Sequence, residues 1–257
     1  MSRSRNRPRH LETRIGPQSV VPPPTLEELL ERSHVAGRAA VSNASELRRG
    51  VERAAGDRRH PAPLDEAWAS VGRVFGATAA DPRIDPAHTI GAAREAMARV
   101  SELAGSNARI ALATSLPASL LTVHLAIARF ARISGADVAD GDDAGPMRVD
   151  GRADRYVRWL DGVAVVTDGR SLCSVRAVEA AQEWLFMIPR PALVIADGPY
   201  ADVAIDAGIE VIAFAGLDHC SLAIGTGKER RCLVVPMWTD RPPGAYRPLL
   251  ERALATP

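Results

Sequence analysis

The residues of this sequence with the clearest chemical potential are hydroxyls and carboxylates that directly follow short apolar runs. The hydroxyl pair is Thr114 and Ser115, and the carboxylates are Asp168 and Asp197. Each preceding run is short, which is typical of a buried strand and not of a helix. Because the carboxyl ends of parallel strands meet at one edge of a sheet, we expect these side chains to come together.

The loops that carry hydroxyls suit an anionic group. In Thr114-Ser115-Leu116-Pro117 the proline falls in the first turn of a predicted helix, where backbone N–H groups and the helix dipole favour a phosphate. We therefore predict that Thr114 and Ser115 bind a phosphorylated substrate, with Arg170 and Ser171 contributing from the loop after Asp168. The alternative is that the two hydroxyls only cap the helix.

Asp168, Asp197 and His219 are the predicted catalytic residues. Several carboxylates at one sheet edge repel a bare phosphate, so Asp168 and Asp197 are also the candidate ligands of a mediating Mg²⁺ ion. The alternative for both aspartates is an Asx turn that closes a tight loop. His219 is the candidate acid or base, whereas its neighbour Cys220 is an unfavourable nucleophile, because adjacent residues rarely direct both side chains into one site. His124, inside an apolar helix face, is interpreted as a satisfied core histidine.

The stretch from Pro191 to His219 contains the elements that must position these groups. Ala192 to Ala196 predicts a buried strand, Asp197-Gly198-Pro199 breaks it, and the spacing from Tyr200 to Ala207 predicts a helix. A glycine ends that helix, and Glu210 to Ala215 supplies the next strand. A strand–helix–strand unit of this kind predicts parallel neighbours joined by a right-handed crossover.

Further apolar runs extend this architecture along the chain. Strands are also predicted at 109–113, 136–139, 156–160, 163–167 and 232–237, and helices at 26–38 continuing to 51, 64–75, 85–104, 118–133, 175–186 and 246–254. Asp161-Gly162 joins two of these strands as a hairpin turn. The pattern predicts a three-layer, Rossmann-like α/β fold with a mostly parallel sheet and an N-terminal helical layer. The expected divisions are a basic, proline-rich tail at 1–24, the helical layer at 25–104 and an α/β ligand-binding domain at 105–257.

Composition restricts the class of protein. The 257 residues carry a net charge of +1 and are 46% hydrophobic, as in ordinary soluble globular proteins. No apolar stretch reaches the length of a membrane span, and the cysteines lack close pairs, which indicates reduced thiols and a cytoplasmic location. The arginines near the N-terminus could touch nucleic acid, but a solvated tail is the better interpretation, since no aromatic residue accompanies them. The oligomeric state is not predicted.

Several stretches resemble one family over about residues 25 to 252. They are IDPAHTI from Ile84, ALATSLPASLLTVHLA from Ala111, DGVAVVTDGRSL from Asp161, LVIADGPYADVAIDAGIEVIAFA from Leu193 and VVPMWTDRPPGAY from Val234. Together they are similar to a group of actinobacterial proteins that carry the name phosphatase. Members of that group often have histidines where this chain has Leu116, the Cys173 region and Gly198, so the sequence departs from the pattern there.

The resemblance and the predicted site lead to the same expectation, a phosphate-ester hydrolase that acts on a small phosphorylated metabolite. Two alternatives stay open, because a fold by itself does not define a reaction. One is a phosphate- or nucleotide-binding or regulatory protein without turnover, which the missing histidines favour. The other is a sugar-phosphate isomerase or transferase. Neither a membrane nor a nucleic acid is an expected partner.

Overall fold

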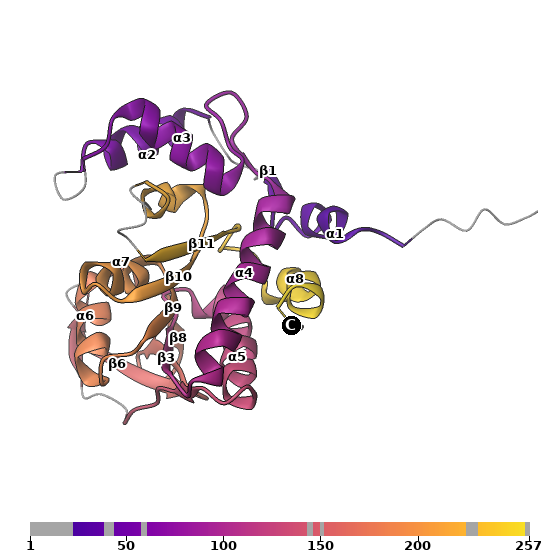
Figure 1. Cartoon of the computed structure of the whole chain (residues 1–257). Helices are drawn as coiled ribbons and strands as arrows, with labels where there is room; N and C mark the ends of the chain where they lie inside the picture. The colour runs from indigo at the N-terminus through magenta and orange to yellow at the C-terminus, as the bar shows by residue number, and fades with distance from the viewer. Residues whose placement is uncertain are drawn as a thin grey trace, which may run out of the picture.

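The molecule is built in layers around one sheet. The computed structural model describes residues 23–38, 44–57, 61–142, 146–149, 152–224 and 231–254, so the tail predicted at 1–24 lies almost entirely outside the described residues. In Figure 1 the sheet lies between two groups of helices. One group is α6 (Val178–Met187) and α7 (Gly198–Asp206), and the other is α4 (Pro86–Gly105) and α5 (Pro117–Ile133), with α8 (Arg247–Arg252) beside them.

The sheet is mostly parallel, which confirms the predicted α/β class. Within the described residues its order is β11 (Cys232–Pro236), β10 (Glu210–Ala215), β9 (Leu193–Asp197), β3 (Arg109–Ala113), β7 (Val163–Thr167), β6 (Arg152–Leu160) and β5 (Met147–Val149). Neighbours from β11 to β7 are parallel, and β6 and β5 extend the sheet in antiparallel fashion. The short strands β4 (Asp137–Val138) and β8 (Leu172–Cys173) pair with the start of β3 and the end of β7.

Local sequence signals account for the central elements. Every residue of β9 is buried, as expected of a strand with helices on both faces. The chain between α7 and β10 turns at Gly208, whose φ of 68° favours glycine. Asp161 and Gly162 have φ angles of 48° and 79° and form the predicted hairpin turn between β6 and β7.

The N-terminal layer differs from the prediction at its start. It comprises α1 (Leu26–Arg32), β1 (Gly37–Arg38), α2 (Ala44–Ala55), α3 (Leu64–Phe75), β2 (Arg83–Ile84) and α4. The helix predicted over 26–38 is too long, because the chain leaves the helix at His34, which has a φ of 58°. The amides of Val35 and Ala36 then bond back to the carbonyl of Leu30, and β1 pairs with β2. A tertiary strand pairing therefore overrides the helical pattern.

Two helices near the C-terminus begin or end elsewhere than predicted. The helix expected from Val175 begins at Val178, because the preceding residues form β8 and the amide of Val175 bonds to the carbonyl of Ser115. Where the sequence predicts a helix over 246–254, the chain forms a 3₁₀ turn, η2 (Pro243–Tyr246), and then the short helix α8 (Arg247–Arg252). A further 3₁₀ turn, η1 (Leu217–Leu222), follows β10.

The connections place a topological switch point between β3 and β9. The chain leaves β3 through α5 toward β4 and β7, whereas it leaves β9 through α7 toward β10 on the other side of the sheet. The two connections depart in opposite directions, and open α/β sheets bind ligands beyond the carboxyl ends of the strands at such a switch point. The topology thus identifies the carboxyl ends of β3 and β9 as the favoured place for a ligand.

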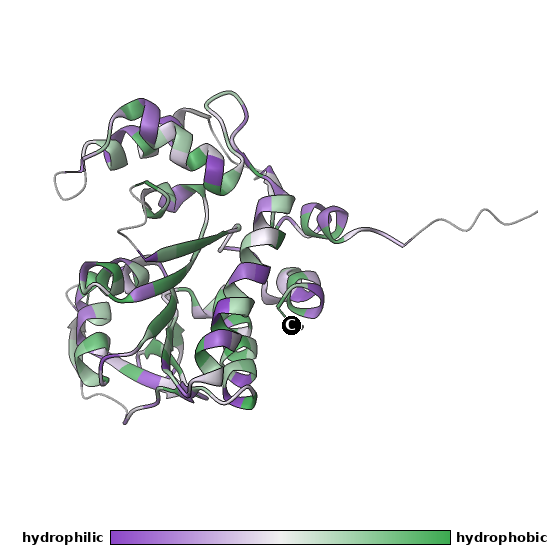
Figure 2. Ribbon diagram, viewed as in Figure 1, coloured by the Kyte–Doolittle hydropathy of each residue, from purple (hydrophilic) through white to green (hydrophobic). Residues whose placement is uncertain are grey.

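One core joins the helical layer to the sheet. The central strands β3, β7, β9 and β10 are largely hydrophobic, whereas β6 also carries hydrophilic residues, and hydrophilic residues lie on the outer sides of the helices (Figure 2). The main buried cluster includes Val71 of α3, Met97 of α4 and Val235 of β11. A smaller cluster around Val166 and Val175 packs beside it. Within the described part of the chain, no helix has the length and apolar character that crossing a bilayer requires.

Candidate functional site

A buried cluster of one carboxylate and two hydroxyls lies at this switch point. Asp197 is 1% exposed, Thr114 is 0% exposed and Ser115 is 3% exposed. The Oδ2 atom of Asp197 accepts the hydroxyl of Thr114 at 2.5 Å, and Oδ1 accepts the backbone N–H of Ser115 at 2.9 Å together with the Ser115 hydroxyl. These donors replace the water that burial removes, and hydrogen bonds to an ionised acceptor are the stronger kind.

The strand register brings these residues together. Ala113 of β3 pairs with Ala196 of β9, so the next residues, Thr114 and Asp197, are level at the carboxyl ends of the two strands. Two helices begin at this point, α5 at Pro117 and α7 directly after Asp197. Unpaired N–H groups and the helix dipoles make such a place favourable for an anion.

Gly198 allows the two loops to approach closely. Its φ is 50°, a left-handed conformation, and a Cβ atom at this position would lie 2.9 Å from Oγ of Ser115. A side chain at 198 would therefore displace the serine hydroxyl as well as strain the backbone.

His124 and Tyr200 place unsatisfied polar atoms near Asp197. Nδ1–H of His124 donates to the carbonyl of Leu120 at 3.0 Å, so Nε2 is a bare acceptor, 3.9 Å from Oδ2 of Asp197. Neither this Nε2 nor the Tyr200 hydroxyl has a hydrogen-bond partner among the described residues. Burial lowers the pKa of His124, while burial and then the charge of Asp197 raise the pKa of Tyr200, so both are neutral near pH 7.

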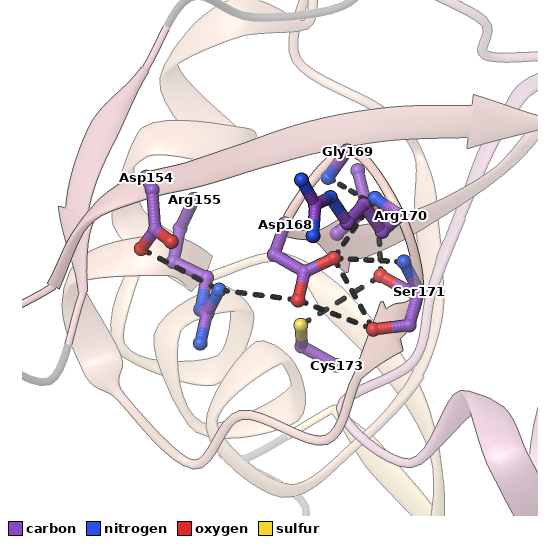
Figure 3. A network of polar contacts seen from close by, with 8 residues as sticks. Asp154, Arg155, Asp168, Gly169, Arg170, Ser171 and Cys173 are labelled. Carbon is purple, nitrogen blue, oxygen red and sulfur yellow. Dashed lines mark hydrogen bonds and ion pairs between the residues drawn. The ribbon is translucent and has the colours of Figure 1, made fainter.

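Asp168 is held within its own turn. Its Oδ1 accepts the backbone N–H groups of Ser171 and Arg170 at 2.7 and 2.9 Å, and its Oδ2 faces Arg155 at 3.8 Å (Figure 3). These hydrogen bonds, Ser171 first and Arg170 second, lower the pKa of Asp168 to about 2. Asp168 therefore has the geometry of the Asx turn that was the alternative interpretation.

The sheet edge after β10 carries a separate charged group. Asp218 and His219 lie on η1, with Nδ1 of His219 at 3.3 Å from Oδ2 of Asp218 and a guanidinium nitrogen of Arg176 at 3.5 Å from the same oxygen. The hydrogen bond to Asp218 raises the pKa of His219 despite its partial burial. Cys220 is 2% exposed, and burial raises the pKa of its thiol to about 11, which does not favour a reactive thiolate.

The structure brings together some of the predicted site residues and separates others. Thr114, Ser115 and Asp197 share hydrogen bonds, as the convergence of strand ends requires. Thr114 donates its amide to the carbonyl of Ala164 in β7. Asp168, directly after the end of β7, therefore lies about 10 Å further along the strand direction than the level of Thr114 and Asp197. Ser171 and Arg170 belong to the Asp168 turn, and His219 belongs to the η1 group.

The arrangement of the two predicted metal ligands bears on the expected Mg²⁺ ion. Both oxygens of Asp197 already accept hydrogen bonds, and Asp168 bonds to its own turn. Among the described residues, no three His, Cys, Asp or Glu side chains are grouped so that they could hold a metal. A shared site for Asp168 and Asp197 does not fit this arrangement, and the need for Mg²⁺ stays a prediction.

The sequence does not predict that the polar atoms of His124 and Tyr200 lie beside this cluster. His124 is buried as predicted, but its Nε2 is not satisfied. For Tyr200 the sequence predicts only a place in a helix, although its position in the first turn after Asp197 is a usable signal. For His124 no local signal existed, since the apolar neighbours that suggested a core position are present in either case.

The family model named Phosphatase matches residues 23–256, so the chain belongs to that family. A Streptomyces coelicolor protein named Phosphatase SCO2771 is 27% identical over 232 residues, which cover 82% of this chain and 87% of the relative. No solved structure matches the chain significantly.

Proposed function

We propose that this member of the Phosphatase family hydrolyses phosphate esters of small metabolites at the switch point between β3 and β9. The observation that supports the proposal most strongly is the hydrogen bond from the Ser115 hydroxyl to the buried carboxylate of Asp197, at the point where α5 and α7 begin. The Streptomyces relative is named a phosphatase, and its alignment covers most of both chains, which supports the same reaction class.

Each of the predicted site residues would have its own role in such a reaction. Thr114, Ser115 and the N-terminus of α5 would hold the phosphate, because hydroxyls and helix N–H groups stabilise its negative charge. Asp197 would orient a hydroxyl or a water and accept its proton. His219, with its raised pKa, would supply a proton to the leaving group from the η1 side. Arg170 and Ser171 would contact the substrate only from the rim, at the turn after β7.

A second candidate is a phosphate-binding or regulatory protein without turnover. One observation favours it: Thr114, Ser115 and Asp197 are almost fully buried and bond to one another, so the cluster would also serve simply to tie two loops together. In that case the same variants would change ligand affinity or stability without any effect on a reaction.

A hydrolysis assay combined with a thermal-shift screen separates the candidates. The purified protein is incubated with a panel of phosphorylated metabolites, with and without Mg²⁺. An enzyme releases inorganic phosphate, and Asp197→Asn abolishes the release, whereas Asp65→Asn, an exposed aspartate on α3, leaves it unchanged. A ligand-dependent rise in melting temperature without phosphate release would identify a binding protein. Neither release nor a shift with any ester would contradict the proposal.

A further inference from the structure

We propose that Ser115 is the nucleophile of the reaction, so that hydrolysis passes through a phosphoserine at position 115. This inference rests on the proposed function and specifies its mechanism. Two routes are chemically open in such a site: direct attack by water, or attack by a protein hydroxyl followed by hydrolysis of the phosphorylated enzyme.

The first argument is the pairing of a hydroxyl with a base. The Ser115 hydroxyl donates to Oδ1 of Asp197, and the backbone N–H of the same serine donates to the same oxygen at 2.9 Å. Thr114 holds the other oxygen at 2.5 Å, so the carboxylate cannot rotate away. A weak nucleophile with an adjacent, oriented base is the arrangement that nucleophilic catalysis requires.

The second argument distinguishes Ser115 from Thr114. The Thr114 hydroxyl accepts the amide of Leu116 at 3.1 Å while it donates to Asp197, so one of its lone pairs is occupied by the turn that starts α5. The Ser115 hydroxyl donates to Asp197 and lies against the glycine that begins α7, where a Cβ would be 2.9 Å away. A nucleophile needs a free lone pair, and no donor among the described residues bonds to Oγ of Ser115, so its lone pairs are free.

The third argument is the unsatisfied acceptor on the far side of the carboxylate. Nε2 of His124 is wholly buried, lacks a donor among the described residues and lies 3.9 Å from Oδ2 of Asp197. A buried acceptor without a partner is unfavourable while Asp197 is ionised. Once Asp197 has taken a proton it becomes a donor, and a carboxyl proton on Oδ2 would face Nε2. A protonated Asp197 would thus have an acceptor on its far side, and a small movement of either side chain would close the 3.9 Å gap to a hydrogen bond.

The proposed steps balance in atoms and charge. In the first, Oγ of Ser115 forms a bond to phosphorus, the bond from phosphorus to the ester oxygen breaks, Asp197 takes the serine proton, and the leaving oxygen takes a proton from His219 or water. In the second, water attacks phosphorus and inorganic phosphate leaves. Oγ of Ser115 recovers the proton held by Asp197, and the proton lost by the water restores the acid. The phosphoserine would lie at the start of α5 and α7, whose dipoles stabilise its charge.

The test is to trap the phosphorylated enzyme and, separately, to transfer its phosphoryl group to an added alcohol. Because Ser115 is only 3% exposed, the small donors acetyl phosphate and p-nitrophenyl phosphate are used. The full chain is quenched in acid after mixing, and the peptide with Ser115 is examined by mass spectrometry for one added phosphoryl group. In parallel, ethanol or glycerol is added as an acceptor, since a covalent intermediate partitions between water and alcohol. The variants are Ser115→Ala and the matched control Ser101→Ala on α4.

The outcomes separate this inference from the proposed function. A phosphoryl group on Ser115, absent in Ser115→Ala and retained in Ser101→Ala, with transfer to the alcohol, supports the inference. Hydrolysis without any adduct or transfer, and with Ser115→Ala within about threefold of the parent rate, would overturn it and leave the hydrolase proposal standing. Absence of both hydrolysis and adduct in the folded wild-type protein would overturn both.

Discussion

At the residue scale, the site depends on a few contacts that leave little freedom. The Asp197 carboxylate is buried away from solvent and accepts hydrogen bonds from the hydroxyls of the neighbouring loop. Gly198 is required twice, for its left-handed φ and for the space it leaves to Ser115. These two requirements can be separated, because another glycine in this chain meets only the first.

Gly198→Ala should therefore lower the free energy of unfolding more than Gly169→Ala. Both variants place an alanine in the left-handed region, which costs about 1–2 kcal/mol. Only Gly198→Ala also crowds Ser115, whereas nothing lies within 4 Å of a Cβ at Gly169. We expect about 1–3 kcal/mol of additional loss and a reduced hydrolysis rate for Gly198→Ala alone. Chemical denaturation measures the difference, and equal losses in both variants would contradict the crowding.

The His219 pKa should depend on Asp218. The hydrogen bond and the charge of Asp218 raise this pKa above its ordinary 6.5, so Asp218→Asn should lower it. A raised folded-state pKa means that the pair stabilises the fold below about pH 6.5 and that this contribution is lost as pH rises through the raised value. Proton NMR titration of the imidazole measures the shift, and Asp65→Asn is the control. His124, whose pKa burial lowers, should show no titration near neutral pH.

At the element scale, one capping residue fixes where α4 begins. Asp85 begins α4 by accepting the amide of Ala87 at 2.9 Å, and its own amide bonds to the carbonyl of Phe75 at 2.8 Å, which joins α3 to α4. The close turn leaves no room for a side chain at Gly76, where a Cβ would lie 2.6 Å from that of Asp85. The Asp85 cap therefore fixes the point at which α4 begins its path over the sheet.

Removal of this cap should weaken the protein without changing the chemistry of the site. Asp85→Ala loses the side-chain acceptor and should lower the free energy of unfolding by about 1 kcal/mol, whereas Asp85→Asn, which can still cap, should lose less. Denaturant unfolding of the two variants gives the values. If alanine and asparagine were equally destabilising, the capping bond would not be the cause.

At the scale of the whole molecule, the helical layer and the sheet are bonded as one unit. Thr89 of α4 donates its hydroxyl to the carbonyl of Pro236 at the end of β11 at 2.6 Å, and both groups are buried. The indole N–H of Trp238 donates to the carbonyl of Gly37 in β1 at 3.0 Å. Together with the shared core, these bonds predict that the two parts unfold together.

Thr89→Val tests this coupling. The change keeps the shape of the side chain but leaves the buried Pro236 carbonyl without its donor, so we expect a loss of about 1–3 kcal/mol in the free energy of unfolding. Thr122→Val, at an exposed position of α5, should be nearly neutral. Tryptophan fluorescence and far-ultraviolet circular dichroism should follow one common transition. Separate transitions would mean that the helical layer is an independent unit.

The sequence by itself determined what depends on near neighbours. The β9–α7–β10 unit, the Asp161-Gly162 turn and the start of α4 follow from periodicity, glycine and capping residues that act over a few positions. The hydroxyls and carboxylates after the strands were visible in the same way. Only the tertiary structure decided which of them meet: Thr114 and Asp197 are 83 residues apart and share a hydrogen bond because β3 and β9 are neighbours in register. Asp168 bonds instead within its own loop, and His124 of α5 lies with Nε2 3.9 Å from Oδ2 of Asp197. Strand order and register are set by the packing of the whole core, and no local pattern encodes them.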